Sequence, residues 1–123
     1  MSASQSQPEN LHPKFFTKSQ WQKLLSNSSH DNLMQHRPVV KLFTPDCGST
    51  WLLVSVSKSD PDLAFGLCDL GVGFPELGYV SLKELSQIRG RLNLPVERDR
   101  YIDLNKSLKT YTDLAEINRR IVT

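Results

Sequence analysis

The stretch Trp51–Leu70 decides the fold, and it reads WLLVSVSKSDPDLAFGLCDL. Its first and last parts, WLLVSVS and LAFGLCDL, are rich in the branched and large apolar residues that favour strands. Between them, Ser59–Asp62 (SDPD) has residue types typical of a turn. Two strands joined by so short a turn pair in antiparallel fashion. The stretch therefore predicts a β-hairpin in the middle of the chain.

Two more apolar segments extend this hairpin on either side. Val39–Thr44 lies upstream, before a turn of the type Pro-Asp-Cys-Gly, and Glu76–Val80 lies downstream, after Gly71–Pro75. We therefore expect a four-stranded antiparallel meander. In its second strand, alternation places three apolar side chains on one face. These are Leu52, Val54 and Val56.

The helices are indicated mainly by their N-terminal caps. Thr17 and Gln20 form a capping box for a helix that runs to about Leu25, and Ser81 and Glu84 form a second one. The second helix is predicted over Leu82–Arg89, with Gly90 as a left-handed C-cap. A third helix is expected from about Asp113. Its predicted buried residues are Leu114, Ile117 and Ile121.

Length and composition limit the class of protein. A chain of 123 residues with 38% hydrophobic and 23% charged residues is long enough for one folded domain and too apolar for a disordered chain. It has neither a membrane-spanning run nor a signal peptide, so we expect a cytoplasmic protein without a membrane partner. Residues 1–13 are polar and aperiodic and are interpreted as a disordered leader. Residues 14–123 are predicted to form a single α+β domain whose helices pack on one face of the sheet.

Basic residues are concentrated in one segment, although the net charge is only +2. Four of the seven arginines fall within twelve residues, in a part of the chain that we expect to be extended or irregular. Such a segment suits phosphate or an acidic partner, and we predict that it is the binding surface. The four are Arg89, Arg91, Arg98 and Arg100.

Carboxylates suggest a competing, catalytic interpretation. In an extended segment Glu97 and Asp99 point to one side, where Asp69 or Glu76 from the sheet would complete a divalent metal site. With Mg²⁺ or Mn²⁺, such a site suits a nuclease acting on single-stranded DNA. The structural alternative is an ion-pair ladder between these carboxylates and the arginines, which would tie the irregular segment to the sheet.

Other chemistry-bearing residues give weaker signals. Cys47 lies in a turn before Gly48 and would be an exposed thiol, with His36 as a candidate base. Cys68 lies in a predicted strand, where the alternation of its neighbours indicates a small core residue. Gly71–Gly73 lacks the Lys-Ser/Thr of a phosphate-binding loop and predicts a hairpin turn. Gly66 and Gly78 lie inside strands and suggest a bulge or a close backbone approach, for example beneath Trp51. One further set of aromatic residues would form a stacking face for single-stranded nucleic acid. It comprises Trp51, Phe65 and Tyr79.

An ordered series of short motifs resembles a known family. The series begins with KLFTPD (41–46) and Trp51, continues through FGL (65–67) and ELGY (76–79), and ends with LP (94–95) and ERD (97–99). It resembles the bacterial domain-of-unknown-function family 2958 over residues 39–101, whose members often lie on plasmids and integrated mobile elements. The N-terminal leader and the C-terminal helix lie outside this resemblance and are expected to be particular to this chain.

The resemblance implies no established activity. We therefore expect a non-enzymatic accessory protein of a mobile element that binds a protein partner, for example as an inhibitor of a defence system. The alternatives are the metal-dependent nuclease and a nucleic-acid-binding protein without catalysis. No cofactor is expected unless the nuclease interpretation holds.

Overall fold

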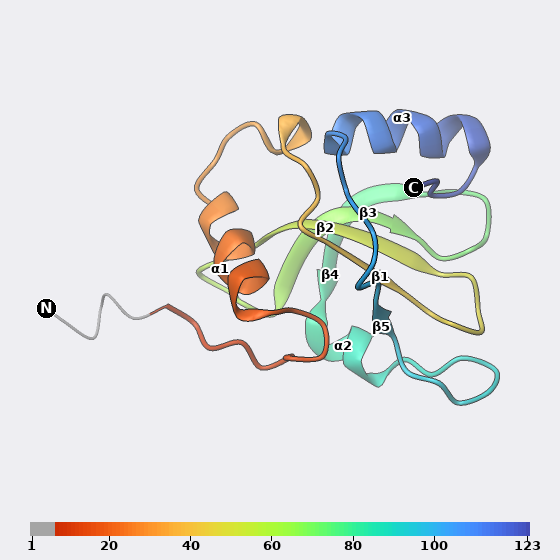
Figure 1. Cartoon of the computed structure of the whole chain (residues 1–123), viewed down its shortest axis with the longest axis horizontal. Helices are drawn as coiled ribbons and strands as arrows, with labels where there is room; N and C mark the ends of the chain where they lie inside the picture. Colours follow the sequence, from red (N-terminus) through yellow and green to blue (C-terminus); the bar gives the residue numbers. More distant parts are fainter. Residues whose placement is uncertain (1–6) are drawn as a thin grey trace, which may run out of the picture.

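A five-stranded antiparallel sheet forms the centre of the computed structural model, which describes residues 7–123 (Figure 1). The strand order is β4-β3-β2-β1-β5, so that β4 and β5 are the two edges. Four strands confirm the predicted meander, and β5 is an addition to it, because two residues of the irregular segment pair with β1. The strands are β1 (Val40–Phe43), β2 (Thr50–Val56), β3 (Leu63–Asp69), β4 (Glu76–Ser81) and β5 (Glu97–Arg98).

Helices cover both faces of the sheet, so the prediction that they share one face is wrong. The helix α1 (Lys18–Asn27) and the short α2 (Leu82–Gln87) contribute to one apolar cluster, together with Trp51 and Leu53 of β2. The helix α3 (Leu108–Asn118) contributes to a second cluster on the opposite face. The central strand β2 is consequently buried on both sides. A short 3-10 turn, η2 (Leu33–Gln35), packs beside α3.

A β-bulge in β2 changes which residues share a face. The pairing with β3 shifts between Leu53 and Ser55, and beyond this point the alternation is displaced by one residue. Leu52 and Val54 therefore join the cluster beneath α3, whereas Val56 joins the cluster beneath α1. The predicted common face of these three residues is wrong for that reason. The side-chain amide of Asn27, fully buried at the end of α1, donates to the Val54 carbonyl at 2.8 Å and supports the bulge.

The N-terminal caps are largely those that local sequence predicted. The Thr17 hydroxyl accepts from the Gln20 amide at 3.1 Å, and the Gln20 side chain accepts from the Thr17 amide at 2.9 Å, which confirms the capping box. Ser81 caps α2 by accepting from the Glu84 amide, but among the described residues the Glu84 side chain does not accept from the Ser81 amide, so the second predicted capping box is only half formed. The Asp62 carboxylate also serves this cap, because it accepts from the Lys83 amide and the Ser81 hydroxyl.

Two predicted helix boundaries are wrong. The helix α2 ends at Gln87 rather than Arg89, and Gly90 does not adopt a left-handed conformation. The helix α3 begins at Leu108, after its cap Ser107, and not at Asp113.

The face that α3 buries also differs from the predicted one, because a different set of residues at helical spacing meets the sheet. Of the predicted residues, Ile121, which lies beyond the end of α3, still packs against the second cluster. Ile117 is 78% exposed. The residues of α3 that are buried are Leu108, Tyr111, Thr112 and Ala115.

Residues 7–13, the second part of the predicted leader, lie against α1. The indole nitrogen of Trp21 donates to the Pro8 carbonyl at 2.7 Å, and the Asn10 side chain donates to the Phe16 carbonyl at 3.1 Å. Phe16 stacks on Trp21 with 5.6 Å between ring centroids, and the two residues form a hydrophobic staple around the N-cap of α1. Residues 1–6 of the predicted leader lie outside the described residues. In the described part of the chain, no helix is both long enough and apolar enough to span a membrane.

Candidate anion-binding pocket

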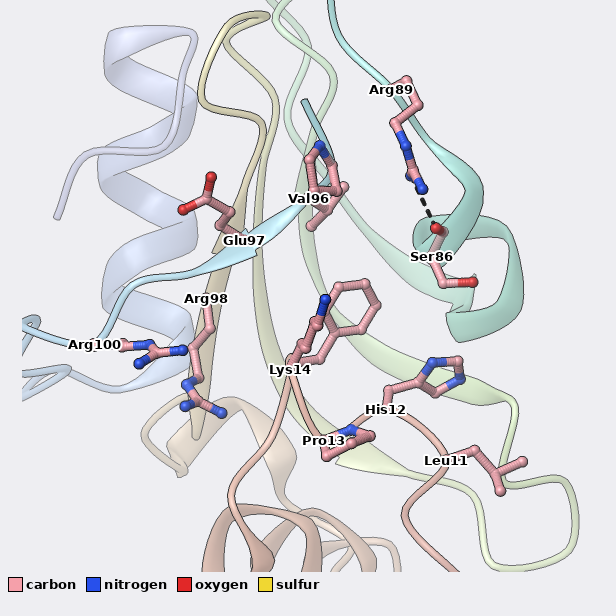
Figure 2. Close-up of a pocket in the computed structure, with 12 residues that line it drawn as sticks. Leu11, His12, Pro13, Lys14, Ser86, Arg89, Val96, Glu97, Arg98 and Arg100 are labelled. Atoms are coloured by element: carbon pink, nitrogen blue, oxygen red, sulfur yellow. Dashed lines mark hydrogen bonds between the residues drawn. The ribbon is translucent and has the colours of Figure 1, made fainter. Parts of the chain in front are cut away.

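A pocket of about 610 Å³ opens between the N-terminal segment, the end of α2 and β5 (Figure 2). Its volume lies within the range of ordinary small-ligand sites. Part of its wall is apolar, because Phe15 and Val96 belong to the core beneath it. Three of the four arginines predicted for binding line it. They are Arg89, Arg98 and Arg100.

The chain positions these arginines from two elements. Arg98 lies in β5, whose pairing with Leu42 fixes it at the sheet edge, and Arg100 lies just beyond the strand. Arg89 follows α2, and its guanidinium donates to the carbonyls of Ser86 and Ile88 at 3.1 and 2.8 Å. In Figure 2 Arg98 and Arg100 lie on one side of the pocket and Arg89 on the other. The fourth predicted arginine, Arg91, is exposed and does not line the pocket.

The N-terminal segment supplies the part of the pocket that sequence reasoning missed. Lys14 and His12 line it opposite β5. Burial lowers the pKa of His12 below its ordinary value, against a smaller opposing effect of Asp62, so at neutral pH His12 is mainly uncharged. The positive charge of the pocket therefore comes from Lys14 and the arginines. The sequence offered one signal, the His12-Pro13-Lys14 run directly before the capping box, but nothing local related it to residues 89–100.

The predicted ion-pair ladder is absent from residues 7–123. Asp99 faces Lys41, with 3.9 Å between Nζ and Oδ2, and also accepts from the Tyr101 amide at 3.0 Å. The other ion pair joins Lys109 to Asp113 on α3. Glu97 is exposed, and Figure 2 shows its carboxylate directed away from Lys14. Within the described chain, the pocket arginines are therefore not neutralised by salt bridges.

The structure separates the four carboxylates of the nuclease interpretation. Glu76 lies on the edge strand β4 and Glu97 on the opposite edge strand β5. Asp69 is only 3% exposed and accepts from the Gly71 and Ile121 amides at 2.8 and 2.9 Å, which fixes a turn and the C-terminal segment. Among the described residues, no group of three or more His, Cys, Asp and Glu side chains is placed to hold a metal ion.

The aromatic residues proposed for stacking are also separated. Trp51 is 1% exposed and forms part of the core beneath α1. Phe65 and Tyr79 do pair, with 5.1 Å between ring centroids. Phe65 packs against the cluster beneath α3. This cluster lies on the sheet face opposite the core beneath the pocket that Lys14 and the three arginines line, called the basic pocket from here on.

The two cysteines differ in their environments. Cys47 is exposed in the β1–β2 turn. The ring of His36, its suggested base, packs against His30 with 4.8 Å between ring centroids. Cys68 is partly buried against the core, as predicted, and burial together with the nearby Glu76 raises its pKa to about 11. A thiol with such a pKa is a poor nucleophile at neutral pH.

The glycine motifs have structural roles. Gly71 and Gly73 adopt positive φ angles of 79° and 90° in the connection between β3 and β4, which confirms the predicted hairpin turn. Gly66 meets the backbone of β2, whereas nothing lies near the position of a Cβ on Gly78. The expected close approach is therefore found at Gly66 and not at Gly78.

Comparison with known proteins gives one match. No curated protein and no solved structure matches the chain. A family model described as "Protein of unknown function (DUF2958)" matches residues 15–122. The match is wider than the resemblance over residues 39–101 and includes α1 and α3, so the expectation that the C-terminal helix is particular to this chain is wrong. Because the model covers nearly the whole sequence, the chain belongs to the DUF2958 family.

Proposed function

We propose that the chain is a non-enzymatic binding protein whose basic pocket receives an anionic group of a protein partner. One observation carries this proposal: Lys14, Arg98 and Arg100 line one open pocket, and none of them forms a salt bridge within residues 7–123. Cationic side chains that a protein does not neutralise internally are available to a ligand. Desolvated charge pairs and Arg contacts are also frequent centres of binding energy in protein interfaces.

The placement of the carboxylates supports binding over catalysis. A divalent metal needs several oxygen ligands at about 2.0–2.6 Å, and Glu76 and Glu97 stand on opposite edges of the sheet. The buried Asp69 already accepts two backbone hydrogen bonds. Each of these carboxylates therefore has a separate structural or surface role, which supports the proposal that they do not form one metal site.

Two features favour a protein partner over nucleic acid. The net charge of +2 is small for a protein that follows a phosphate backbone. The Phe65–Tyr79 pair, of which Tyr79 is exposed, and the basic pocket also lie on different faces of the sheet, so one strand of nucleic acid would not use both at once. Inhibition of a defence system is one form that such protein binding would take, and the identity of the partner tests it.

The test is affinity capture with matched variants. The tagged full chain, an Arg100→Gln/Lys14→Gln variant and an Arg91→Gln control are incubated with lysate of the source cells, with and without nuclease treatment. Arg100 and Lys14 are exposed, so these changes leave the core intact, and equal melting temperatures check this. We expect a specific protein that is retained by the wild type and the control and lost by the double variant.

Two results would contradict the proposal. Equal capture by all three proteins would place the partner elsewhere on the surface. Loss of all captured protein after nuclease treatment would indicate nucleic acid as the actual ligand.

A further inference from the structure

One side-chain nitrogen of Arg98, which lines the basic pocket, lacks a hydrogen-bond partner within residues 7–123. The Nη1 nitrogen of Arg98 is covered by protein and has no hydrogen-bond acceptor among the described residues. A covered guanidinium nitrogen without an acceptor costs free energy, because it has lost water and gained no partner. Arg98 and Arg100 also line a second pocket of about 440 Å³, together with residues of β1 and the start of α1. The lining of the first pocket has four cationic side chains, those of Lys14, Arg89, Arg98 and Arg100, against the one carboxylate of Glu97, so its charged donors exceed its acceptors.

The N-terminal segment holds a further cation over the same space. Lys14 directly precedes Phe15 and Phe16, which are 5% and 1% exposed, so the backbone that carries Lys14 is anchored in the core. The amides of Phe15 and Phe16 both donate to the His12 carbonyl, at 2.9 and 3.1 Å, and close a tight turn there. In Figure 2 the Lys14 side chain extends into the space below Val96. Lys14, Arg98 and Arg100 thus reach one pocket from two fixed backbones.

We infer that this pocket binds a phosphoryl group. Near neutral pH such a group carries a charge of about −1.5 to −2 and offers three strong acceptor oxygens. Arginine guanidinium forks match phosphate oxygens in bidentate fashion, and lysine adds a point charge. A carboxylate carries one charge and two oxygens, and would leave part of this donor set without an acceptor. The inference deepens the proposed function and rests on it, because it concerns the same pocket.

The apolar wall of Phe15 and Val96 accommodates the carbon atoms that carry the phosphoryl group. Two sources share this chemistry, a phosphorylated side chain of a partner protein and a small phosphate ester. Both are compatible with a pocket of about 610 Å³. The experiment below distinguishes them.

The test is a titration of the full-length protein followed by amide NMR shifts. Inorganic phosphate, phosphoserine, a phosphoserine peptide and glutamate are added separately at constant ionic strength set with chloride. We expect saturable shifts near residues 12–15 and 96–100 with each phosphate compound, and at least about tenfold weaker binding of glutamate. Lys14→Gln and Arg100→Gln are each expected to weaken phosphate binding about tenfold, and the matched control Arg91→Gln is expected to leave it unchanged.

The outcomes separate this inference from the proposed function. Glutamate binding as tight as phosphoserine, non-saturating shifts, or equal weakening by Arg91→Gln would overturn the phosphoryl inference, while pocket-dependent capture of a partner would still stand. Saturable phosphate binding without any captured protein would support the inference and contradict the proposed protein partner. A phosphopeptide that binds at least about tenfold more tightly than phosphoserine would identify a partner's side chain as the source, and equal affinities would identify a small phosphate ester.

Discussion

Gly66 and Gly78 face each other across β3 and β4, and the structure predicts opposite responses to alanine. A Cβ on Gly66 would overlap the Leu52 carbonyl oxygen and would stand 2.8 Å from Leu53 Cα, whereas ordinary contacts begin at 3.4 Å. The obstacle is backbone, so no side chain can rotate away. A Cβ on Gly78 meets nothing within 4 Å.

The size of the Gly66→Ala effect follows from where the clash falls. The opposing strand β2 is buried on both faces and paired on both sides, so it cannot move far enough to relieve the overlap without disturbing both cores. Overpacking of a well-packed interior costs about 1–3 kcal/mol, occasionally more. We expect Gly66→Ala to lower the free energy of unfolding by about 3 kcal/mol, and the melting temperature by roughly 10–15 °C for a domain of this size. Gly78→Ala is expected to change the free energy of unfolding by less than about 0.5 kcal/mol.

The assay is urea denaturation followed by tryptophan fluorescence and circular dichroism, with thermal melting as a second measurement. The fluorescence reports on the core between α1 and the sheet, because both tryptophans, Trp21 and Trp51, are buried there. A loss below about 1 kcal/mol in Gly66→Ala would refute the reasoning. An equal loss in Gly78→Ala would also refute it, since that would mean that both sites respond to the residue type and not to the contact.

Three further predictions concern the Thr17 cap of α1, the two cysteine thiols and the Asp62 carboxylate at the start of α2. Thr17→Ala removes the N-cap of α1 and is expected to cost about 1 kcal/mol in urea denaturation; no change would mean that the cap is redundant. At pH 8 a disulfide-exchange reagent is expected to label Cys47 quickly and Cys68 only after unfolding, because burial raises the pKa of Cys68 to about 11; rapid labelling of two thiols in the folded protein would contradict this. The pKa of the Asp62 carboxyl is lowered in the folded protein, chiefly by the hydrogen bond from Ser81. The ionised Asp62 therefore stabilises the fold at pH values above its ordinary pKa of 3.8. This stabilisation is lost as the pH falls through the lower pKa of the folded state. Asp62→Ala should therefore destabilise the protein at pH 7 and have little effect at pH 2, as measured by urea denaturation at both pH values, and an equal effect at both would disprove the linkage.

Local features of this protein could be read from the sequence alone. The capping box of α1 and the Ser81 cap of α2 depend on residues three apart, and the four strands of the meander depend on apolar segments between turns. Such features involve contacts between near neighbours along the chain, so the residue types themselves indicate them. The concentration of arginines in residues 89–100 was equally visible.

Only the tertiary structure decided how these pieces combine. The bulge in β2 is a property of the pairing between two strands, and it determined which apolar residues lie beneath α1 and which beneath α3. The order of the strands placed Glu76 and Glu97 on opposite edges, which separated residues that a linear reading had joined. Conversely, packing of the segment before α1 against the core brought Lys14 to Arg98 and Arg100. Contacts between residues more than eighty positions apart depend on the packing of the whole chain, and no local pattern in the sequence records them.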